Sequence, residues 1–191
     1  MSVFTNPASR STDDARAYTT AVLNLLGDRD PMRVLHDTSV ALREALVGLS
    51  DPQMAQPEAP GKWSIRQVLQ HLADSELVWG YRLRLVLAQD RPPLTGYDQD
   101  RWAQRLHYDE ADVETALDDF AVLRRANLRL LEHASIDDLA RVGVHAERGE
   151  EGVSHMIRLY AGHDLLHLAQ LERIGRGVRL AIAVKSEQNS P

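Results

Sequence analysis

One face of a predicted helix in the last third of the chain, called the seam below, constrains the fold more than any other feature. Its members recur every three or four residues, the spacing of one face of an α-helix. All are apolar except one tyrosine and two histidines: Met156, Tyr160, His163, His167, Leu171 and Ile174. The pattern predicts a long helix over Val153–Ile174 that ends at Gly175, because glycine commonly follows the last turn of a helix. A helix with such a face needs partner helices that bury it.

Two earlier segments carry the start signals of helices. Ser11 is expected to cap a short helix that runs to about Leu26. Asp30 is followed by a proline, the combination of a capping carboxylate and a proline in the first turn. The apolar face that begins there continues to Leu49. Residues 50–61 contain three prolines and are expected to form a loop.

Two further long helices are predicted in the middle of the chain. Ser64 and Gln67 fit a capping box, which opens a helix whose apolar positions reach Leu87. Asp109 is expected to cap the next helix, whose inward face covers Val113–Leu131. No strand-like alternation lasts long enough to compete. Four long amphipathic helices after a short one therefore predict an all-α four-helix bundle.

The length of the chain, 191 residues, favours a single domain. We expect residues 1–10 to be disordered, residues 11–175 to form the helical domain and residues 176–191 to form a C-terminal tail. No apolar run approaches the roughly 20 residues that span a bilayer. The N-terminal residues also lack the basic and then apolar plan of a signal peptide. We therefore expect a cytoplasmic protein with no membrane partner.

Charge and cysteine content exclude several kinds of function. The formal net charge is −6, so the chain lacks the electrostatic footprint of a nucleic-acid-binding protein. The sequence contains no cysteine, which excludes disulfides, thiolate metal ligands and a thiol nucleophile of its own. An external thiol remains possible as a substrate.

The histidines of the seam are candidate metal ligands. His163 and His167 are one helical turn apart, so they share a face and can present two nitrogens to one ion. His71 lies in the other strongly patterned helix. Three imidazoles without cysteine suit Zn²⁺ or Ni²⁺, and three protein ligands leave a position for water or substrate. Asp74, three residues after His71, is a candidate base or hydrogen-bond acceptor for a ligand.

Each of these residues also has a purely structural interpretation. The histidines could be separately hydrogen-bonded residues of the core, and Asp74 a solvated carboxylate. Asp164 lies about 100° around the helix from His163, so we expect it to serve a neighbouring group or solvent. Aromatic residues in a long loop often only pack that loop down. With this alternative open, five further residues are candidates for bordering a pocket or its entrance: Arg82, Tyr97, Trp102, His145 and His155.

Three stretches of the sequence resemble the DinB-like superfamily, particularly its YfiT-like branch of metal-dependent hydrolases and bacillithiol transferases. They read KWSIRQVLQHLADSE at Lys62–Glu76, GYDQDRWA at Gly96–Ala103 and LYAGHDLLHLAQL at Leu159–Leu171. The combination is more specific than any one stretch, and it extends in order across most of the chain. The resemblance implies an up-down-down-up four-helix bundle and a homodimer.

The resemblance also implies a divalent metal ion held by His71, His163 and His167, the same residues that the spacing selects. Relatives of this kind attach a low-molecular-weight thiol, such as bacillithiol or mycothiol, to an electrophile. The residues alone do not distinguish thiol transfer from hydrolysis by an activated water. Where relatives often carry further histidines, this chain has Leu165 and Leu166, so the resemblance does not specify the substrate. The alternative is a non-catalytic metal-binding or interaction bundle with a structural ion.

Overall fold

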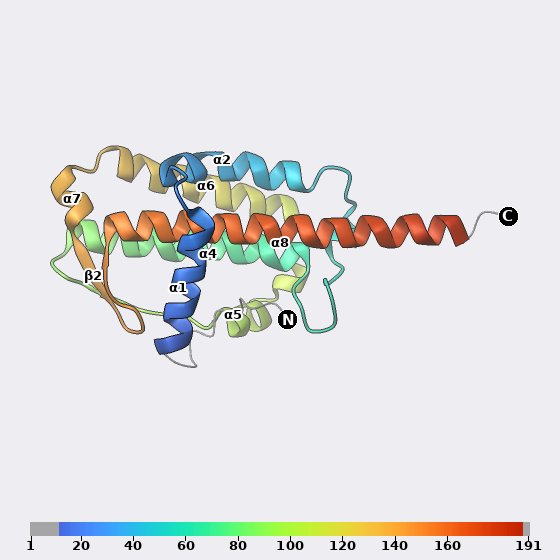
Figure 1. Ribbon diagram of the computed structural model, residues 1–191, viewed down its shortest axis with the longest axis horizontal. Helices are drawn as coiled ribbons and strands as arrows, with labels where there is room; N and C mark the ends of the chain where they lie inside the picture. The colour runs from blue at the N-terminus through green and yellow to red at the C-terminus, as the bar shows by residue number, and fades with distance from the viewer. Residues whose placement is uncertain (1–11, 189–191) are drawn as a thin grey trace.

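The computed structural model describes residues 12–188 (Figure 1). The expected disorder of residues 1–10 and the expected cap at Ser11 lie outside the described residues. Four helices form a bundle, and α1, which is as long as α2, lies across it against α8 (Figure 1). The five helices are α1 Thr12–Leu26, α2 Pro31–Ala45, α4 Ile65–Ala88, α6 Val113–Glu132 and α8 Val153–Gln188. The prediction of an all-α four-helix bundle is confirmed.

The order of the helices around the bundle decides which side chains can meet. Helix α8 packs against both α2 and α4, and α6 packs against the same two helices from the other side. Helices α2 and α4, although consecutive long helices in the chain, therefore occupy opposite corners. This arrangement places α4 directly beside α8, which the histidine prediction requires.

Helix starts follow the predicted capping in two of three cases. The Asp30 carboxylate accepts a hydrogen bond from the backbone N–H of Met32 at 2.9 Å, and Ser64 and Gln67 form a reciprocal capping box. The prediction for α6 is wrong, because Asp112 and not Asp109 caps that helix. Its carboxylate accepts from the backbone N–H of Thr115 at 2.8 Å. Asp109 instead lies in a 3-10 turn just before the helix.

The predicted end of the last helix is also wrong. Helix α8 continues through Gly175 and reaches Gln188. Gly175 does not have the positive φ of a helix-terminating glycine. The next turn of the helix makes a further hydrophobic contact with the core. Val178 is buried in the same apolar cluster as Ile174. Burial of this additional turn therefore outweighs the stop signal.

A small sheet, absent from the sequence-based prediction, lies at one end of the bundle. Strand β1 pairs in parallel with β2, and β2 pairs antiparallel with β3. Strands of two to four residues are too short to show alternation in a sequence. The sheet brings Leu94 level with His145. The shorter elements are α3 Asp51–Met54, β1 Pro93–Leu94, α5 Gln99–Arg105, a 3-10 turn at Tyr108–Glu110, α7 Ile136–Ala140, β2 Val142–His145 and β3 Gly149–Gly152.

The core consists of two apolar clusters with polar residues between them. One cluster gathers around Phe120 and Leu171, and the other gathers around Trp79 and Met156. Along both α4 and α8, a group of buried polar side chains lies at the boundary between the clusters. The members of this polar layer are Thr38, His71, Ser75, Glu76, Arg124, Asn127, Asp164 and His167, with the partly buried His163 beside them.

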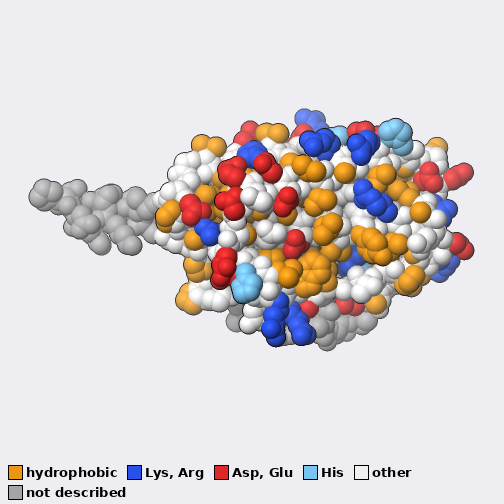
Figure 2. Space-filling model, turned by 180° about the vertical axis from the view of Figure 1, so that it is seen from behind, with side chains coloured by type: hydrophobic (Ala, Val, Ile, Leu, Met, Phe, Trp, Pro, Cys, Tyr) orange, Lys and Arg blue, Asp and Glu red, His pale blue; other side chains and the backbone are white. Residues whose placement is uncertain are grey.

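Acidic and basic side chains occur side by side on the face turned away from the viewer of Figure 1, among scattered hydrophobic ones (Figure 2). No continuous basic patch covers the described part of that face, in keeping with the net negative charge. Within residues 12–188, every helix is too short or too polar to cross a lipid bilayer.

Candidate metal centre and its cavities

Three histidines from two helices converge in the polar layer. Helix α4 supplies His71, and α8 supplies His163 and His167. One ring nitrogen from each lies within 4.8 Å of those of the other two. The Nε2 atoms of His71 and His163 are 3.3 Å apart. The structure thus brings together the three residues that the sequence selected, and their role as metal ligands stays a prediction.

The surroundings keep the three imidazoles uncharged at neutral pH. Burial lowers the pKa of His71 and of His163 well below the usual value, and the neighbouring imidazoles add to the effect. Burial also lowers the pKa of His167 to about 4. Neutral imidazoles have a free nitrogen lone pair, which a metal ion requires. This donor set of three neutral nitrogens therefore fits a borderline divalent ion such as Zn²⁺ or Ni²⁺.

Gln170 orients one of the candidate ligands. Its side-chain oxygen Oε1 lies 2.8 Å from Nδ1 of His167. Because an amide oxygen only accepts hydrogen bonds, Nδ1 of His167 carries the proton, and Nε2 keeps its lone pair. Such a contact fixes the tautomer and the orientation of a metal-binding ring. The sequence gives no separate signal for Gln170 beyond its position three residues after His167, within one helical turn.

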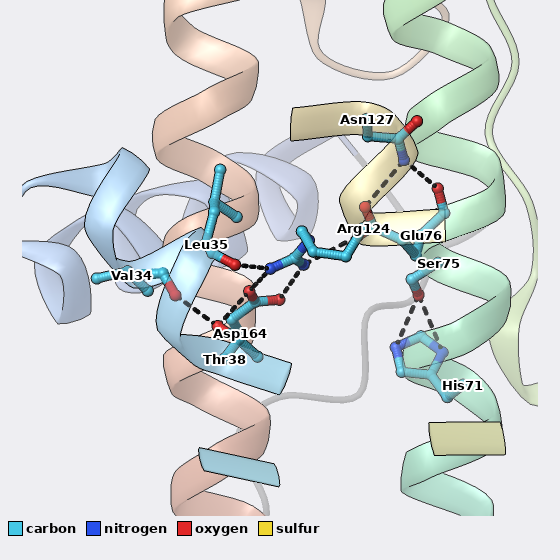
Figure 3. A network of polar contacts seen from close by, with 9 residues as sticks. All are labelled: Val34, Leu35, Thr38, His71, Ser75, Glu76, Arg124, Asn127 and Asp164. Carbon is cyan, nitrogen blue, oxygen red and sulfur yellow. Dashed lines mark hydrogen bonds and ion pairs between the residues drawn. The ribbon is translucent and has the colours of Figure 1, made fainter. Parts of the chain in front are cut away.

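A buried ionic network lies near His71 (Figure 3). Arg124 on α6 donates to Asp164 on α8 at 2.6 Å and to Glu76 on α4 at 2.9 Å. Thr38 on α2 donates to Asp164 at 2.8 Å, and Asn127 donates to Glu76 at 2.9 Å. Both carboxylates and the guanidinium are at most 2% exposed. All four long helices are thereby joined at the level of the histidines.

The sequence predicts only part of this network. Asp164 serves the neighbouring helices, one of the two roles expected for it. No role is predicted for Arg124 or Glu76. A usable signal was present, because Arg124 lies four residues after Phe120 and four before Leu128 on the apolar face of α6. A charged side chain in such a position needs a buried partner.

Asp74 faces the 3-10 turn. Its carboxylate accepts a hydrogen bond from the hydroxyl of Tyr108 and another, at 3.2 Å, from Nε2 of Gln70. Burial and the Asp74 contact raise the pKa of Tyr108, so this hydroxyl stays protonated as a donor. Asp74 therefore secures the loop after α5 against α4. The predicted role of Asp74 as a base stays a prediction.

Two cavities approach the histidines from different sides. The first has a volume of about 50 Å³ and is bordered by His71 and His163. The second is larger, about 700 Å³, and is bordered by His167 and Gln170. Gln99 on α5 borders both. The two cavities therefore border different members of the histidine cluster.

Three of the five predicted pocket residues line the first cavity, and none lines the second. Arg82, Tyr97 and His145 line the first cavity, as the sequence suggested. Trp102 lies outside it and packs against Tyr97, with ring centroids 4.5 Å apart. Among the described residues, His155 borders neither cavity.

Comparison with known proteins agrees with the fold and with a metal centre. The sequence pattern of the DinB superfamily matches residues 34–171. A protein of Oceanobacillus iheyensis and one of Bacillus cereus strain B4264, each named "putative metal-dependent hydrolase", are 30% identical to the chain over 137 residues. Each alignment covers 72% of this chain and 79% of the relative.

A solved structure has the same architecture. It is YfiT from Bacillus subtilis, described as "a probable metal-dependent hydrolase with an unusual four-helix bundle topology". The two structures superpose with a TM-score of 0.72 at 23% sequence identity, covering 91% of this chain and 92% of YfiT. At this identity the likeness establishes the fold.

Proposed function

This chain belongs to the DinB superfamily, and from that premise we propose that it is a metal-dependent enzyme acting on small molecules. His71, His163 and His167 would hold one Zn²⁺ or Ni²⁺ ion. The observation that carries the proposal is the convergence of three neutral imidazoles within 4.8 Å of one another, beside two cavities. A fourth protein ligand, typical of structural zinc sites, is absent from this cluster in the described residues.

The three histidines would hold a divalent ion, whose Lewis acidity would lower the pKa of a water or of a thiol and make either a nucleophile near neutral pH. The residues of the chain have separate tasks. Gln170 holds the His167 ring in one tautomer, and the Arg124 network fixes the turn of α8 that carries Asp164 between His163 and His167. These contacts keep the histidines in place before substrate arrives.

The hydroxyl groups beside His71 are suited to orienting a substrate. Ser75 Oγ lies 3.3 Å from Nε2 of His71 and 2.9 Å from the hydroxyl of Tyr97. Both side chains line the first cavity. Asp74 stays the proposed base, although among the described residues its carboxylate borders neither cavity and holds the Tyr108 hydroxyl.

The nucleophile is either water, in a hydrolysis, or a low-molecular-weight thiol, in a transfer to an electrophile. The names of the relatives support hydrolysis, and the presence of two cavities supports a reaction between two small molecules. A third possibility is a non-catalytic bundle whose metal ion only stabilises the fold, and the experiments below distinguish it from the other two. The expected homodimer and cytoplasmic location stay predictions.

Metal analysis of the purified protein tests the site. One equivalent of a divalent metal is expected per chain, and His163→Ala should lose it because two ligands bind far more weakly than three. His155→Ala, on the same helix, is the matched control and should retain the metal. Undiminished metal content in His163→Ala would contradict the assignment.

Activity assays then separate the alternatives. The chelated and the metal-reconstituted protein are incubated with a thiol and a chromogenic electrophile, and separately with a chromogenic ester. Metal-dependent turnover in the first assay identifies a thiol transferase, and turnover in the second identifies a hydrolase. A protein that binds metal and gains thermal stability from it, but turns over neither class, would favour the structural ion.

A further inference from the structure

A buried cation without a carboxylate partner lines the first cavity. Arg82 on α4 is only 6% exposed. Its guanidinium donates to the backbone carbonyl of Thr95, while its Nε atom has no hydrogen-bond partner among the described residues. The other arginine of this cavity, Arg148, is paired with Glu151. Arg82 has no such ion pair within the described part of the chain, and a buried charge without a counter-charge is costly.

A second unpartnered donor lines the same cavity. His145, on β2, is 2% exposed. Its Nδ1 accepts a hydrogen bond from the backbone N–H of Glu147 at 3.2 Å, so the neutral ring carries its proton on Nε2. That Nε2 atom is buried and has no partner in the described structure. Burial and the nearby Arg148 lower the pKa of His145 to about 4, so the ring remains neutral at pH 7.

The two donors are complementary to one kind of group. A carboxylate has two oxygens that accept hydrogen bonds, and charge-assisted bonds to it are about twice as strong as neutral ones. A single unpaired guanidinium matches the single negative charge of a carboxylate. The cavity volume of about 50 Å³ suits a small polar group rather than a whole large molecule. Glu147 is the only carboxylate among the lining residues, and it forms no ion pair with Arg82 in the described structure.

We propose that this cavity holds the carboxylate of an anionic substrate between Nε of Arg82 and Nε2 of His145, with the reacting end of the molecule towards His71 and His163. Both of these histidines border the same cavity. The orientation of the substrate, with its reacting end towards them, rests on the proposed metal-dependent function. The carboxylate subsite itself rests on the two unpartnered donors. The enzyme would accordingly select small acids over their neutral analogues.

Matched pairs of thiols test the subsite in the metal-loaded protein. The probes are mercaptocarboxylates with one to four methylene groups and their methyl esters, which keep the thiol but lose the charge. Affinities are measured by titration calorimetry. For at least one chain length the acid should bind about tenfold or more tightly than its ester, the effect of one charge-assisted hydrogen bond. Equal binding of acid and ester at every length would overturn the proposal and leave the metal function intact.

Substitutions locate the preference. Arg82→Gln keeps a donor for Thr95 but removes the charge, and it should abolish the preference for the acid. Arg158→Gln, an exposed position on α8, is the control and should keep it. Should Arg82→Gln fail to fold, His145→Gln serves instead and should reduce the preference severalfold. Retention of the full preference in the folded variant would overturn the proposal.

A measurement without metal separates this inference from the proposed function. In metal-free protein, nuclear magnetic resonance should show the Nε2–H signal of His145 shifting with 3-mercaptopropionate and not with its methyl ester. This result supports the subsite even where the three histidines bind no metal. An unchanged His145 signal at saturating acid would overturn it.

Discussion

Replacing Arg124 with methionine tests whether the buried ionic network stabilises the bundle at the level of the histidines. Methionine keeps much of the side-chain volume but leaves the carboxylates of Glu76 and Asp164 buried without their cation. The guanidinium also donates to the Leu35 carbonyl at 2.9 Å and lies 4.6 Å from the centre of the Phe120 ring. All of these contacts disappear together.

The expected loss is large because removing one member of a buried ion pair costs about 3–5 kcal/mol. The total stability of a domain is typically about 5–15 kcal/mol, so the variant should be severely destabilised. For a chain of this size the melting temperature should fall by about 2–4 °C per kcal/mol, or roughly 6–20 °C. Urea denaturation and thermal melting measure both quantities.

Arg125→Met is the matched control, because Arg125 is the exposed neighbour on the same helix. It should change the free energy of unfolding by less than about 0.5 kcal/mol. The triple variant Glu76→Gln/Arg124→Met/Asp164→Asn should recover part of the loss, since no unpaired charge then remains buried. A loss in Arg124→Met below about 1 kcal/mol, or no recovery in the triple variant, would refute this reasoning.

The loss should also depend on pH. Burial raises the pKa of Glu76 even in the intact protein, and Arg124 is the strongest influence that opposes this rise. Without Arg124, the folded variant binds a proton at a higher pH than the unfolded chain does. The difference in the free energy of unfolding between the native protein and Arg124→Met should therefore shrink as the pH falls from 7 towards 5.

Three further predictions concern packing, acid stability and metal removal. A Cβ atom at Gly162 would lie 2.3 Å from the backbone oxygen of Val22. Gly162→Ala should therefore push α1 away from α8 and lower the free energy of unfolding, measured in urea, by about 1–3 kcal/mol. At Gly177 a Cβ meets nothing within 4 Å, so Gly177→Ala should not destabilise the protein. The pKa of His145 is lowered to about 4 in the folded protein, so the unfolded chain takes up a proton first as the pH falls from about 6.5 to 4, and the native protein loses stability. His145→Gln lacks this group, so its loss of stability over the same pH range should be smaller than that of the native protein by up to about 3 kcal/mol. Removing the metal with a chelator should lower the free energy of unfolding by about 2.7 kcal/mol when free ion had been present at about 100 times its Kd, and His163→Ala should show no such loss on calorimetry.

Local patterns were sufficient for the helices and for part of the candidate site. The seam on α8 and the caps at Asp30 and Ser64 depend on residues within one or two helical turns of each other. The shared face of His163 and His167 follows from the same short spacing. Where two local signals compete, the sequence is insufficient: Gly175 signals an end to the helix, but burial of Val178 in the core extends it.

The sequence by itself determined the bundle class, most helix starts and the identity of the three converging histidines. Only the tertiary structure decided that α4 lies beside α8, so that His71 reaches the pair on the neighbouring helix. It also decided that Arg124 meets Asp164, and that Arg82 and His145 line one cavity. The physical reason is that these pairs are separated by 40 to 96 residues. Such contacts depend on packing of whole helices and on a short sheet, neither of which local periodicity specifies.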